Sequence, residues 1–392
     1  MVYEKEMMNC VWLALKLPDC SPRYTQLINE YGSATNVFTD FAEIHNENPQ
    51  LIKQADFERM QAESPQQLFH RLENTIDELN IKIILLDSEE YPTILKSISN
   101  PPNILFVRGN LPCEVQPKIG IVGSRKCTSY GIESTRAIAN RLSEKGACIV
   151  SGLAEGIDAC ASSAALEVKN NPFPTIAVLG SGIDVIYPKC NEVLYYEIIE
   201  RGAVISQYCP GTLPTSYTFP KRNKVIAGLS SCLIIAEAAK GSGAIISADY
   251  AIRFGRKVFC IPGRITDWQS EGANSLIEAK KATMLLSIEQ VINDYIENPV
   301  EISVTDSIKE IRNDERTPKT PTVKKSITPK IELDETSMTI YKALSDGEKT
   351  FDELCIITGF SSPVLNLSLT TMEFSRIIKQ SHGRTYSILC DI

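Results

Sequence analysis

The sequence has few of the residues from which hydrolytic and redox sites are usually built. It contains three histidines among 392 residues, His45, His70 and His382, and all three lie outside the apolar runs of its central region. The G-x-x-x-x-G-K-S/T pattern of triphosphate-binding loops and the G-x-G-x-x-G pattern of dinucleotide-binding folds are both absent. That region therefore cannot build a Ser-His-Asp triad or a histidine-based metal cluster from its own residues. We expect neither a metal nor a cofactor, and we expect that the protein is not an enzyme.

Long apolar runs and paired cysteines are also missing. No stretch approaches the roughly 20 apolar residues of a membrane span, and the first residues, MVYEKEMMNC, are acidic where a signal peptide is basic. The twelve cysteines include no C-x-x-C pair, and Cys148, Cys232 and Cys260 lie within apolar runs. We expect a cytoplasmic protein, without a membrane partner, whose thiols are reduced and mostly buried.

The central region repeats one unit, in which a β-branched apolar run is followed by a glycine-rich turn and a helical pattern. The first copy, Lys118 to Gly131, reads KIGIVGSRKCTSYG, and later runs read ACIVSG, TIAVLG, AVISQY, CLIIAEA and KVFCIPG. Continuous runs of this kind indicate strands buried on both faces, so we predict an α/β fold with a parallel sheet. Ligands of such sheets bind at the carboxyl ends of the strands, where all the turns fall.

The turns present groups that suit an anion. A helix start that follows a glycine turn offers unpaired N–H groups, and Ser124, Arg125 and Lys126 stand in the first turn after Gly123. Alone, this turn fits a plain strand-to-helix connection with a solvated Arg-Lys pair equally well. The repetition favours a shared binding rim, with further turns at Gly152 to Gly156, Gly180 to Gly182, Pro210-Gly211, Gly241 to Gly243 and Pro262-Gly263.

The charges are distributed unevenly. The whole chain has a net charge of −8, but residues 117–288 hold 19 Lys and Arg against 14 Asp and Glu, a net charge of +5. The remaining residues hold 21 against 34, a net charge of −13. A basic centre between acidic flanks hints at a polyanion partner, although an excess of this size also fits ordinary surface solvation.

The densest basic stretch reads PGTLPTSYTFPKRNKVIAGLS. It places Lys221, Arg222 and Lys224 beside Tyr217 and Phe219, and cations next to aromatic rings suit a single-stranded nucleic acid, whose phosphates are neutralised and whose bases stack. By itself the stretch also fits a solvated surface loop. With Arg125, Lys126 and Lys240 at other strand ends, binding becomes the better interpretation. Asp158 and Asp184 follow glycine turns; they suit acid/base groups, but caps or braces of the loops are favoured.

The flanking regions differ from the centre. Asn9 to Phe38 and Phe41 to Leu79 have helical patterns and predict a small helical bundle, and IKIILLD predicts an edge strand. The turn LPDCSP invites a helix-hairpin-helix interpretation, but Asp19, Cys20 and Ser21 supply none of its glycines, so a packing module is favoured. Glu297 to Asp334 has the composition of a flexible linker.

The last residues predict a winged helix-turn-helix. Its helices are expected at Glu335 to Leu344, Thr350 to Thr358 and Ser361 to Phe374, with a turn at Gly359 and a hairpin in IIKQSHGRTYSIL. The third helix contains no Lys or Arg, which disfavours a DNA-reading winged-helix regulator.

Several motifs together resemble one known family. GSR at Gly123 to Arg125, Tyr130-Gly131, IVSGLAEGID, TIAVLGSGIDVIYP, FPKRNKVIAGLS, GSGAIISADYA, GRKVFCIPG and EGANSLI match, in order and spacing, the DNA-processing protein A family (DprA, also called Smf). The match is strong from Leu86 to Leu286. The resemblance implies an extended Rossmann-like domain at residues 81–296, a SAM-like helical module at 1–80, a linker at 297–334 and a winged helix at 335–392. It also implies a homodimer that binds and protects incoming single-stranded DNA and loads the RecA recombinase during natural transformation or recombination.

The resemblance also indicates a DNA site. Arg125 of GSR and Lys221 and Arg222 of FPKRN correspond to the family's DNA-contacting residues, and the amides of the glycine loops are expected to line a pocket. The full set of predicted DNA-binding residues is Gly123, Ser124, Arg125, Lys126, Gly152, Gly156, Gly180, Gly182, Phe219, Lys221, Arg222, Asn223, Lys240, Gly241, Ser242 and Gly243. The chain departs from the family at Ser162, Ser181 and Gln207, where a histidine, a cysteine and a glutamate are usual.

One enzyme class remains as an alternative. The sheet also resembles, at superfamily level, the nucleotide-cleaving lysine-decarboxylase-like proteins, whose active site needs a PGGxGTxxE motif. The matching stretch here, AAKGSGAIISAD, has no glutamate at that spacing, so a nucleotide-binding or nucleotide-cleaving enzyme is disfavoured.

Overall fold

The computed structural model describes residues 5–18, 21–297, 335–345, 347–361, 364–365, 368–369, 372, 378–381 and 385–388. The chain forms two compact units, Met1–Asn313 and Asp314–Ile392. We describe each unit by itself.

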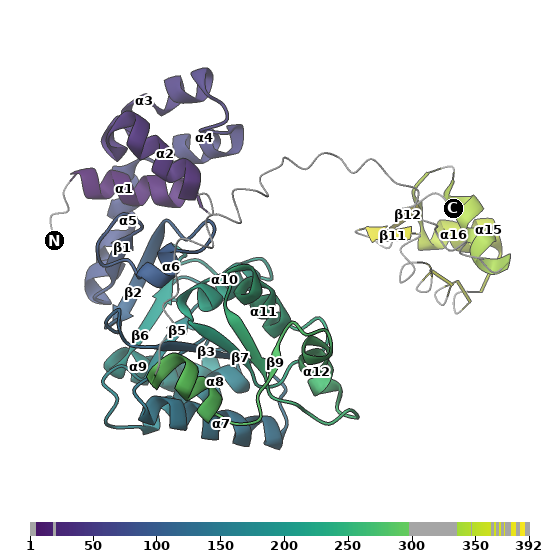
Figure 1. Ribbon diagram of the computed structural model, residues 1–392. Helices are drawn as coiled ribbons and strands as arrows, with labels where there is room; N and C mark the ends of the chain where they lie inside the picture. The colour runs from purple at the N-terminus through teal and green to yellow at the C-terminus, as the bar shows by residue number, and fades with distance from the viewer. Residues whose placement is uncertain are drawn as a thin grey trace. The chain divides into compact units, whose positions relative to one another are not determined.

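A nine-stranded sheet forms the centre of the first unit (Figure 1). Its strands are β1 (Lys82–Leu85), β2 (Ile104–Gly109), β3 (Lys118–Val122), β4 (Cys148–Ser151), β5 (Thr175–Val178), β6 (Ala203–Ser206), β7 (Cys232–Ile235), β8 (Lys257–Cys260) and β9 (Thr283–Met284). Their order in the sheet is β1-β2-β6-β5-β4-β3-β7-β8-β9. The predicted strand runs of the central region are confirmed, and β1 is the edge strand expected from IKIILLD.

The sheet is mostly, not wholly, parallel. The pairs from β6 to β9 are parallel, as predicted. However, β2 pairs antiparallel with both β1 and β6, so the expectation of a parallel sheet is wrong at this edge. The physical reason is that β1 and β2 precede the repeating strand–turn–helix units, so the crossover connections that make the later strands parallel do not set their direction.

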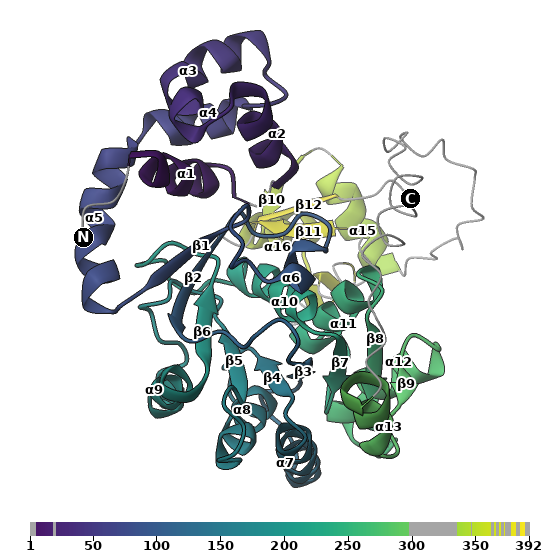
Figure 2. The ribbon, with the colours of Figure 1, turned by 60° about the vertical axis from the view of Figure 1, so that its left-hand side comes forward.

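Helices cover both faces of the sheet (Figure 2). The apolar side chains of α10 and α11 pack on one face, and those of α7, α8 and α13 pack on the other. The helices of this domain are α6 (Thr93–Lys96), α7 (Ser129–Glu144), α8 (Ile157–Glu167), α9 (Glu192–Arg201), α10 (Thr218–Leu229), α11 (Gly243–Arg253), α12 (Glu271–Glu278) and α13 (Glu289–Ile292), with 3₁₀ turns at Lys189–Asn191 and Trp268–Ser270 and a π-helical turn at Asn293–Glu297. The fold is therefore α/β and Rossmann-like.

Burial on both faces explains why the central strands read as continuous apolar runs. All five residues of β3 are buried, and burying a side chain such as Ile119 or Ile121 contributes about 1.5–3 kcal/mol. Lys118 is also buried, because its ammonium donates hydrogen bonds to the carbonyls of Cys113, Glu114 and Gln116. The turns at the carboxyl ends of the strands are thus anchored to fully buried strands.

The predicted helical bundle precedes the sheet. It consists of α1 (Lys5–Lys16), α2 (Ser21–Tyr31), α3 (Ala34–Glu47), α4 (Gln54–Gln61) and α5 (Pro65–Glu78). Trp12 is fully buried against Phe38 and Phe41. The hydrophobic cluster of this bundle continues into β2, β5 and α9. Asp19 and Cys20 of the LPDCSP turn lie outside the described residues, and a separate domain at 1–80 stays a prediction.

The second unit holds two described helices and a small sheet. They are α15 (Glu335–Leu344) and α16 (Phe351–Thr358), with β10 (Lys349–Thr350), β11 (Ile378–Ser381) and β12 (Thr385–Ile388) in the antiparallel order β10-β12-β11. Thr350 caps α16, and Gly359 ends it in a left-handed conformation. These elements match the first two predicted helices and the hairpin. Most of the predicted third helix and, beyond Glu297, the predicted linker lie outside the described residues.

The predicted thiol environment is confirmed for three cysteines. Cys148, Cys232 and Cys260 are buried and unpaired, and burial raises the pKa of the Cys148 thiol to about 12. Such thiols stay protonated at neutral pH and act as small apolar side chains. None of the described helices has the length and apolar character needed to cross a membrane.

Two glycines with the same backbone angle provide a test of packing at the β2–β6 edge. Gly109 and Gly211 both have φ +82°, but a Cβ on Gly109 would meet the carbonyl oxygens of Gly202 and, at 2.7 Å, Ile199, whereas one on Gly211 would meet nothing within 4 Å. Both Gly→Ala changes should cost roughly 1–2 kcal/mol for the left-handed backbone. We expect Gly109→Ala to lower the free energy of unfolding by about 1–3 kcal/mol more, measured by urea denaturation, because of overpacking. Equal losses in the two variants would contradict this packing.

Candidate functional site

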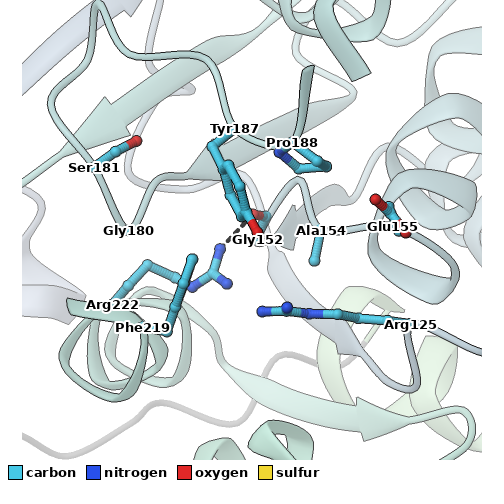
Figure 3. Close-up of a pocket in the computed structure, with 10 residues that line it drawn as sticks. All are labelled: Arg125, Gly152, Ala154, Glu155, Gly180, Ser181, Tyr187, Pro188, Phe219 and Arg222. Atoms are coloured by element: carbon cyan, nitrogen blue, oxygen red, sulfur yellow. Dashed lines mark hydrogen bonds between the residues drawn. The ribbon is translucent and has the colours of Figure 1, made fainter. Parts of the chain in front are cut away.

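A pocket opens where the strands β4 and β5 end. It is lined by Arg125, Gly152, Ala154, Glu155, Gly180, Ser181, Tyr187, Pro188, Phe219 and Arg222 (Figure 3). These residues come from the turns after β3, β4 and β5 and from the first turns of α10. The glycine turns therefore meet at one edge of the sheet, as the parallel topology predicts.

Arg222 forms the floor of this pocket and is not a surface cation. Its side chain is 4% exposed, and its guanidinium donates hydrogen bonds to the carbonyls of Gly152 and, at 2.8 Å, Val178. The alternative interpretation of this stretch as a solvated surface loop is therefore wrong at this residue. The stretch FPKRNK belongs to α10, and successive residues of a helix point about 100° apart, which turns Arg222 inward.

The carboxylate of Asp158 lies beside this guanidinium and fixes the turns. It accepts hydrogen bonds from the backbone N–H groups of Gly123, Gly152 and Ala154. Burial raises the pKa of Asp158, although the charge of Arg222 and the N–H groups act in the opposite direction. Burial likewise lowers the pKa of Arg222. The predicted role of Asp158 as a brace of the loops is confirmed.

Phe219 and Arg125 provide a surface for a flat group. The Arg125 guanidinium carbon lies 5.2 Å from the centroid of the Phe219 ring, and Arg125 is exposed. Tyr187 lies 5.7 Å from the same ring at an angle of 41°. A Cβ on Gly180 would lie 2.7 Å from Phe219, so a glycine there leaves room for the ring. In Figure 3 the Arg125 side chain reaches across the pocket below Glu155 towards Phe219.

A second pocket adjoins the first and extends to the start of α11. It is lined by Val122, Gly123, Ser124, Arg125, Lys126, Ala154, Asp158, Phe219, Arg222, Asn223, Ala239, Ser242, Gly243, Ala244, Ser247 and Trp268. The amide of Asn223 donates to the Gly243 carbonyl at 2.9 Å and so joins α10 to the loop before α11. The Ser242 hydroxyl, at the N-cap of α11, is buried and has no partner among the described residues. An anion there would meet the positive end of the α11 dipole.

Glu237 is a structural residue that the sequence analysis did not identify. It lies just after β7, is 3% exposed, and accepts hydrogen bonds from the backbone N–H and the hydroxyl of Thr128, both at 2.8 Å. Its carbonyl accepts from the Ser124 N–H at 2.7 Å. Glu237 thus fixes the turn that presents Arg125 and Lys126. The signal was a charged residue directly after an apolar strand run, CLIIAEA.

Most of the predicted DNA-binding residues come together in the two pockets, and five do not. Those that do are Gly123, Ser124, Arg125, Lys126, Gly152, Gly180, Phe219, Arg222, Asn223, Ser242 and Gly243. Lys240 and Gly241 are exposed on the β7–α11 loop, and Gly156 and Gly182 lie within turns. Lys221 lines a different hollow. Asp184 accepts hydrogen bonds from the Gly211 N–H, which confirms its predicted role as a brace.

The structure adds pocket residues that were not among the predicted DNA-binding residues. They are Ala154, Glu155, Tyr187, Pro188, Ser247 and Trp268. Their positions depend on how the loops fold back, which local patterns do not reveal. Of the departures from the family pattern, Ser162 is buried and contacts the Thr175 hydroxyl at 3.3 Å, and the Gln207 amide lies 3.2 Å from the Tyr208 hydroxyl; neither lines these two pockets.

Comparisons with known proteins agree on one family. The family model described as DNA recombination-mediator protein A matches residues 82–296. The DNA processing protein DprA of Streptococcus pneumoniae is 42% identical over 205 residues, which are 52% of this chain and 71% of that protein.

Two solved structures have a similar fold. The X-ray structure of the Streptococcus pneumoniae DprA has a TM-score of 0.59 and 32% identity, and the match covers 75% of this chain and 98% of the other. The structure of DNA processing protein A from Helicobacter pylori has a TM-score of 0.50 and 29% identity, covering 57% of this chain and 98% of the other. That structure is described as giving insight into a single-stranded DNA binding mode.

The burial of Arg222 leads to a stability prediction. Arg222→Met should lower the free energy of unfolding by about 3–5 kcal/mol, because it leaves Asp158 buried without its cation. Arg125→Met, at an exposed arginine of the same pocket, should change it by no more than about 0.5 kcal/mol. Chemical denaturation of both variants measures the difference. The double variant Arg222→Met, Asp158→Asn should lose less than the sum of its single variants, and strict additivity would contradict the coupling.

Proposed function

Because the chain belongs to the DNA recombination-mediator protein A family, we propose that the two joined pockets bind single-stranded DNA. The observation that supports this most directly is the pairing of Arg125 with the Phe219 ring above the glycine turns. A base stacks on an aromatic ring, while a neighbouring guanidinium neutralises a phosphate. Paired bases in a duplex cannot offer their faces in this way.

The second pocket would take a phosphate of the same strand. The N-terminus of α11, with Ser242 as its N-cap, carries the positive end of the helix dipole and lines this pocket. Ser124 and Lys126 line it from the turn after β3. The Ser242 hydroxyl would then donate to the phosphate and gain the partner that it lacks among the described residues. The sugar-phosphate backbone of the strand would connect a base on the Phe219 ring with a phosphate at the N-terminus of α11.

A binding role fits the carboxylates of the site better than a nucleotide-cleaving role. Asp158 and Glu237 are both buried and already accept hydrogen bonds from the turns that they hold. Each therefore stabilises the pocket and is not directed at a ligand. The lack of a glutamate in AAKGSGAIISAD supports the same choice.

The remaining features of the proposal come from the family. We include loading of the RecA recombinase, protection of incoming DNA during natural transformation, homodimer formation and a place in the cytoplasm. A winged helix at 335–392 and a linker at 297–334 belong to the same proposal. They stay predictions, as do the roles of the individual site residues.

Binding of oligothymidylate and of duplex DNA, compared by fluorescence anisotropy, tests the stacking surface. The protein should bind the single strand more tightly, and Phe219→Leu should weaken that binding by roughly 1–3 kcal/mol through loss of stacking. The matched control is Phe173→Leu, a half-buried phenylalanine before β5 that lines neither pocket. Equal affinity for the two forms of DNA would refute the proposal.

The salt dependence of binding tests the cations. Arg125→Gln with Lys126→Gln should remove two phosphate contacts and lower the slope of log K against log salt by about 1.4, since each contact on a single strand contributes roughly 0.7. The control is Lys169→Gln with Lys280→Gln, two exposed lysines that line neither pocket. A slope that falls equally in both double variants would mean that the effect is one of overall charge and not of the site.

A further inference from the structure

A third hollow lies next to α10, and it holds the predicted cation that the two pockets leave out. Tyr217, Thr218 and Lys221 line it from the start of α10, and Arg59 and Asn103 line it from α4 and from the residues before β2. We call it the outer hollow. Phe219 lines the pockets described above and is a neighbour in sequence of Thr218, so the first turn of α10 separates the outer hollow from them.

The described lining of the outer hollow contains cations and aromatic rings but no acidic residue. The Lys221 ammonium lies 3.9 Å from the centroid of the Tyr217 ring, and Tyr217 is 68% exposed. Arg59 contacts Asp56, whose carboxylate is also bound by Arg23, so two guanidinium groups share one buried negative charge. The hollow therefore has an excess of positive charge beside an aromatic side chain that is largely exposed.

A buried acceptor also lines the outer hollow. The Asn103 side chain donates through its amide nitrogen to the Leu17 carbonyl at 2.7 Å, and the residue is only 3% exposed. Its Oδ1 atom accepts no hydrogen bond from the residues that the structure describes. An acceptor buried without a donor is unfavourable, so a ligand that brings an N–H or O–H group gains affinity there.

These three features together suit one nucleotide. A nucleotide offers a flat base for the exposed Tyr217 ring, a phosphate for Lys221 and Arg59, and an N–H donor for the Asn103 oxygen. All four bases carry an N–H group on their pairing edge, so the site would tolerate any sequence. A strand of the kind proposed above has such a unit on each side of the one bound at Phe219.

We propose that the outer hollow is a second nucleotide subsite, reached by a single strand that crosses the first turn of α10 from the Phe219 pocket. This inference rests on the proposed function, because the strand must first occupy that pocket. The first turn of α10 then lies between two stacked bases, with Phe219 on one side and Tyr217 on the other. Lys221 contributes to binding in the outer hollow and not in the two joined pockets.

Strand length separates the two subsites. An oligothymidylate of about four nucleotides fits one pocket, and one of about twenty can span both. In anisotropy titrations, Tyr217→Ala with Lys221→Gln should weaken the long strand roughly tenfold and lower its salt slope by about 0.7, while binding of the short strand stays within about twofold. The control is Tyr196→Ala with Lys169→Gln, which removes an exposed tyrosine and an exposed lysine that line no hollow described above.

The outcomes distinguish the two proposals. If the unchanged protein binds neither strand, the proposed function fails and the subsite with it. If it binds both, and the double variant binds both equally well, the outer hollow is no subsite while the proposed function stands. An equal loss for both strands would place Tyr217 in the same pocket as Phe219 and also overturn the subsite. Tyr208 also lines the outer hollow. Photocrosslinking of the unchanged protein to a long strand with 4-thiothymidine should therefore label Tyr208 or Tyr217 as well as Phe219; label at Phe219 alone would contradict the inference without any variant.

Discussion

The guanidinium of Arg222 connects the turns that form the binding rim at the carboxyl ends of the strands. It donates hydrogen bonds to the carbonyls of Gly152 and Val178, at the ends of two neighbouring strands. It also lies beside Asp158, whose carboxylate accepts hydrogen bonds from the N–H groups of three turn residues. One buried charge pair thus determines the positions of the turns after β3, β4 and β5. Taking such a pair out of water is costly, and it persists only because backbone groups satisfy both partners. Arg125, which is exposed, and Phe219, which is half-buried, depend on this framework for their positions.

Local sequence patterns were sufficient to predict the parallel strands at the centre of the sheet, but they did not predict the antiparallel strands at its edge. Runs such as IGIV of β3 and CLII of β7 are apolar at every position because both faces of their strands are covered, so their pattern reveals their burial. The run ILFV of β2 is equally apolar, yet β2 is antiparallel to β6. Strand direction depends on the path of the connecting chain, which periodicity does not contain. For the same reason the sequence did not reveal that the helical bundle shares one hydrophobic cluster with β2 and α9.

The site was predictable as a set of residues but not as a set of roles. The glycine turns and the stretch FPKRNK identified eleven residues that line the pockets. Lys221 and Arg222 were predicted to share one role, contact with DNA. In the helix α10, Lys221 and Arg222 point in different directions: one is half-buried beside Tyr217 and the other is buried beside Asp158. Helical periodicity applied to these residues would have separated them. Tyr187 and Trp268 could not have been found this way, because loop folding brings them to the pockets.

The two tryptophans of the chain occupy opposite environments. Trp12 is fully buried against phenylalanine rings in the helical bundle, whereas Trp268 is 55% exposed at the edge of the second pocket. A water-soluble quencher reaches only the exposed indole, so the intrinsic fluorescence of the unlabelled protein divides into a shielded and an accessible component. A ligand that fills the second pocket changes only the accessible one. The chain therefore carries its own optical reporter of that pocket, together with an internal reference whose emission changes only when the bundle unfolds.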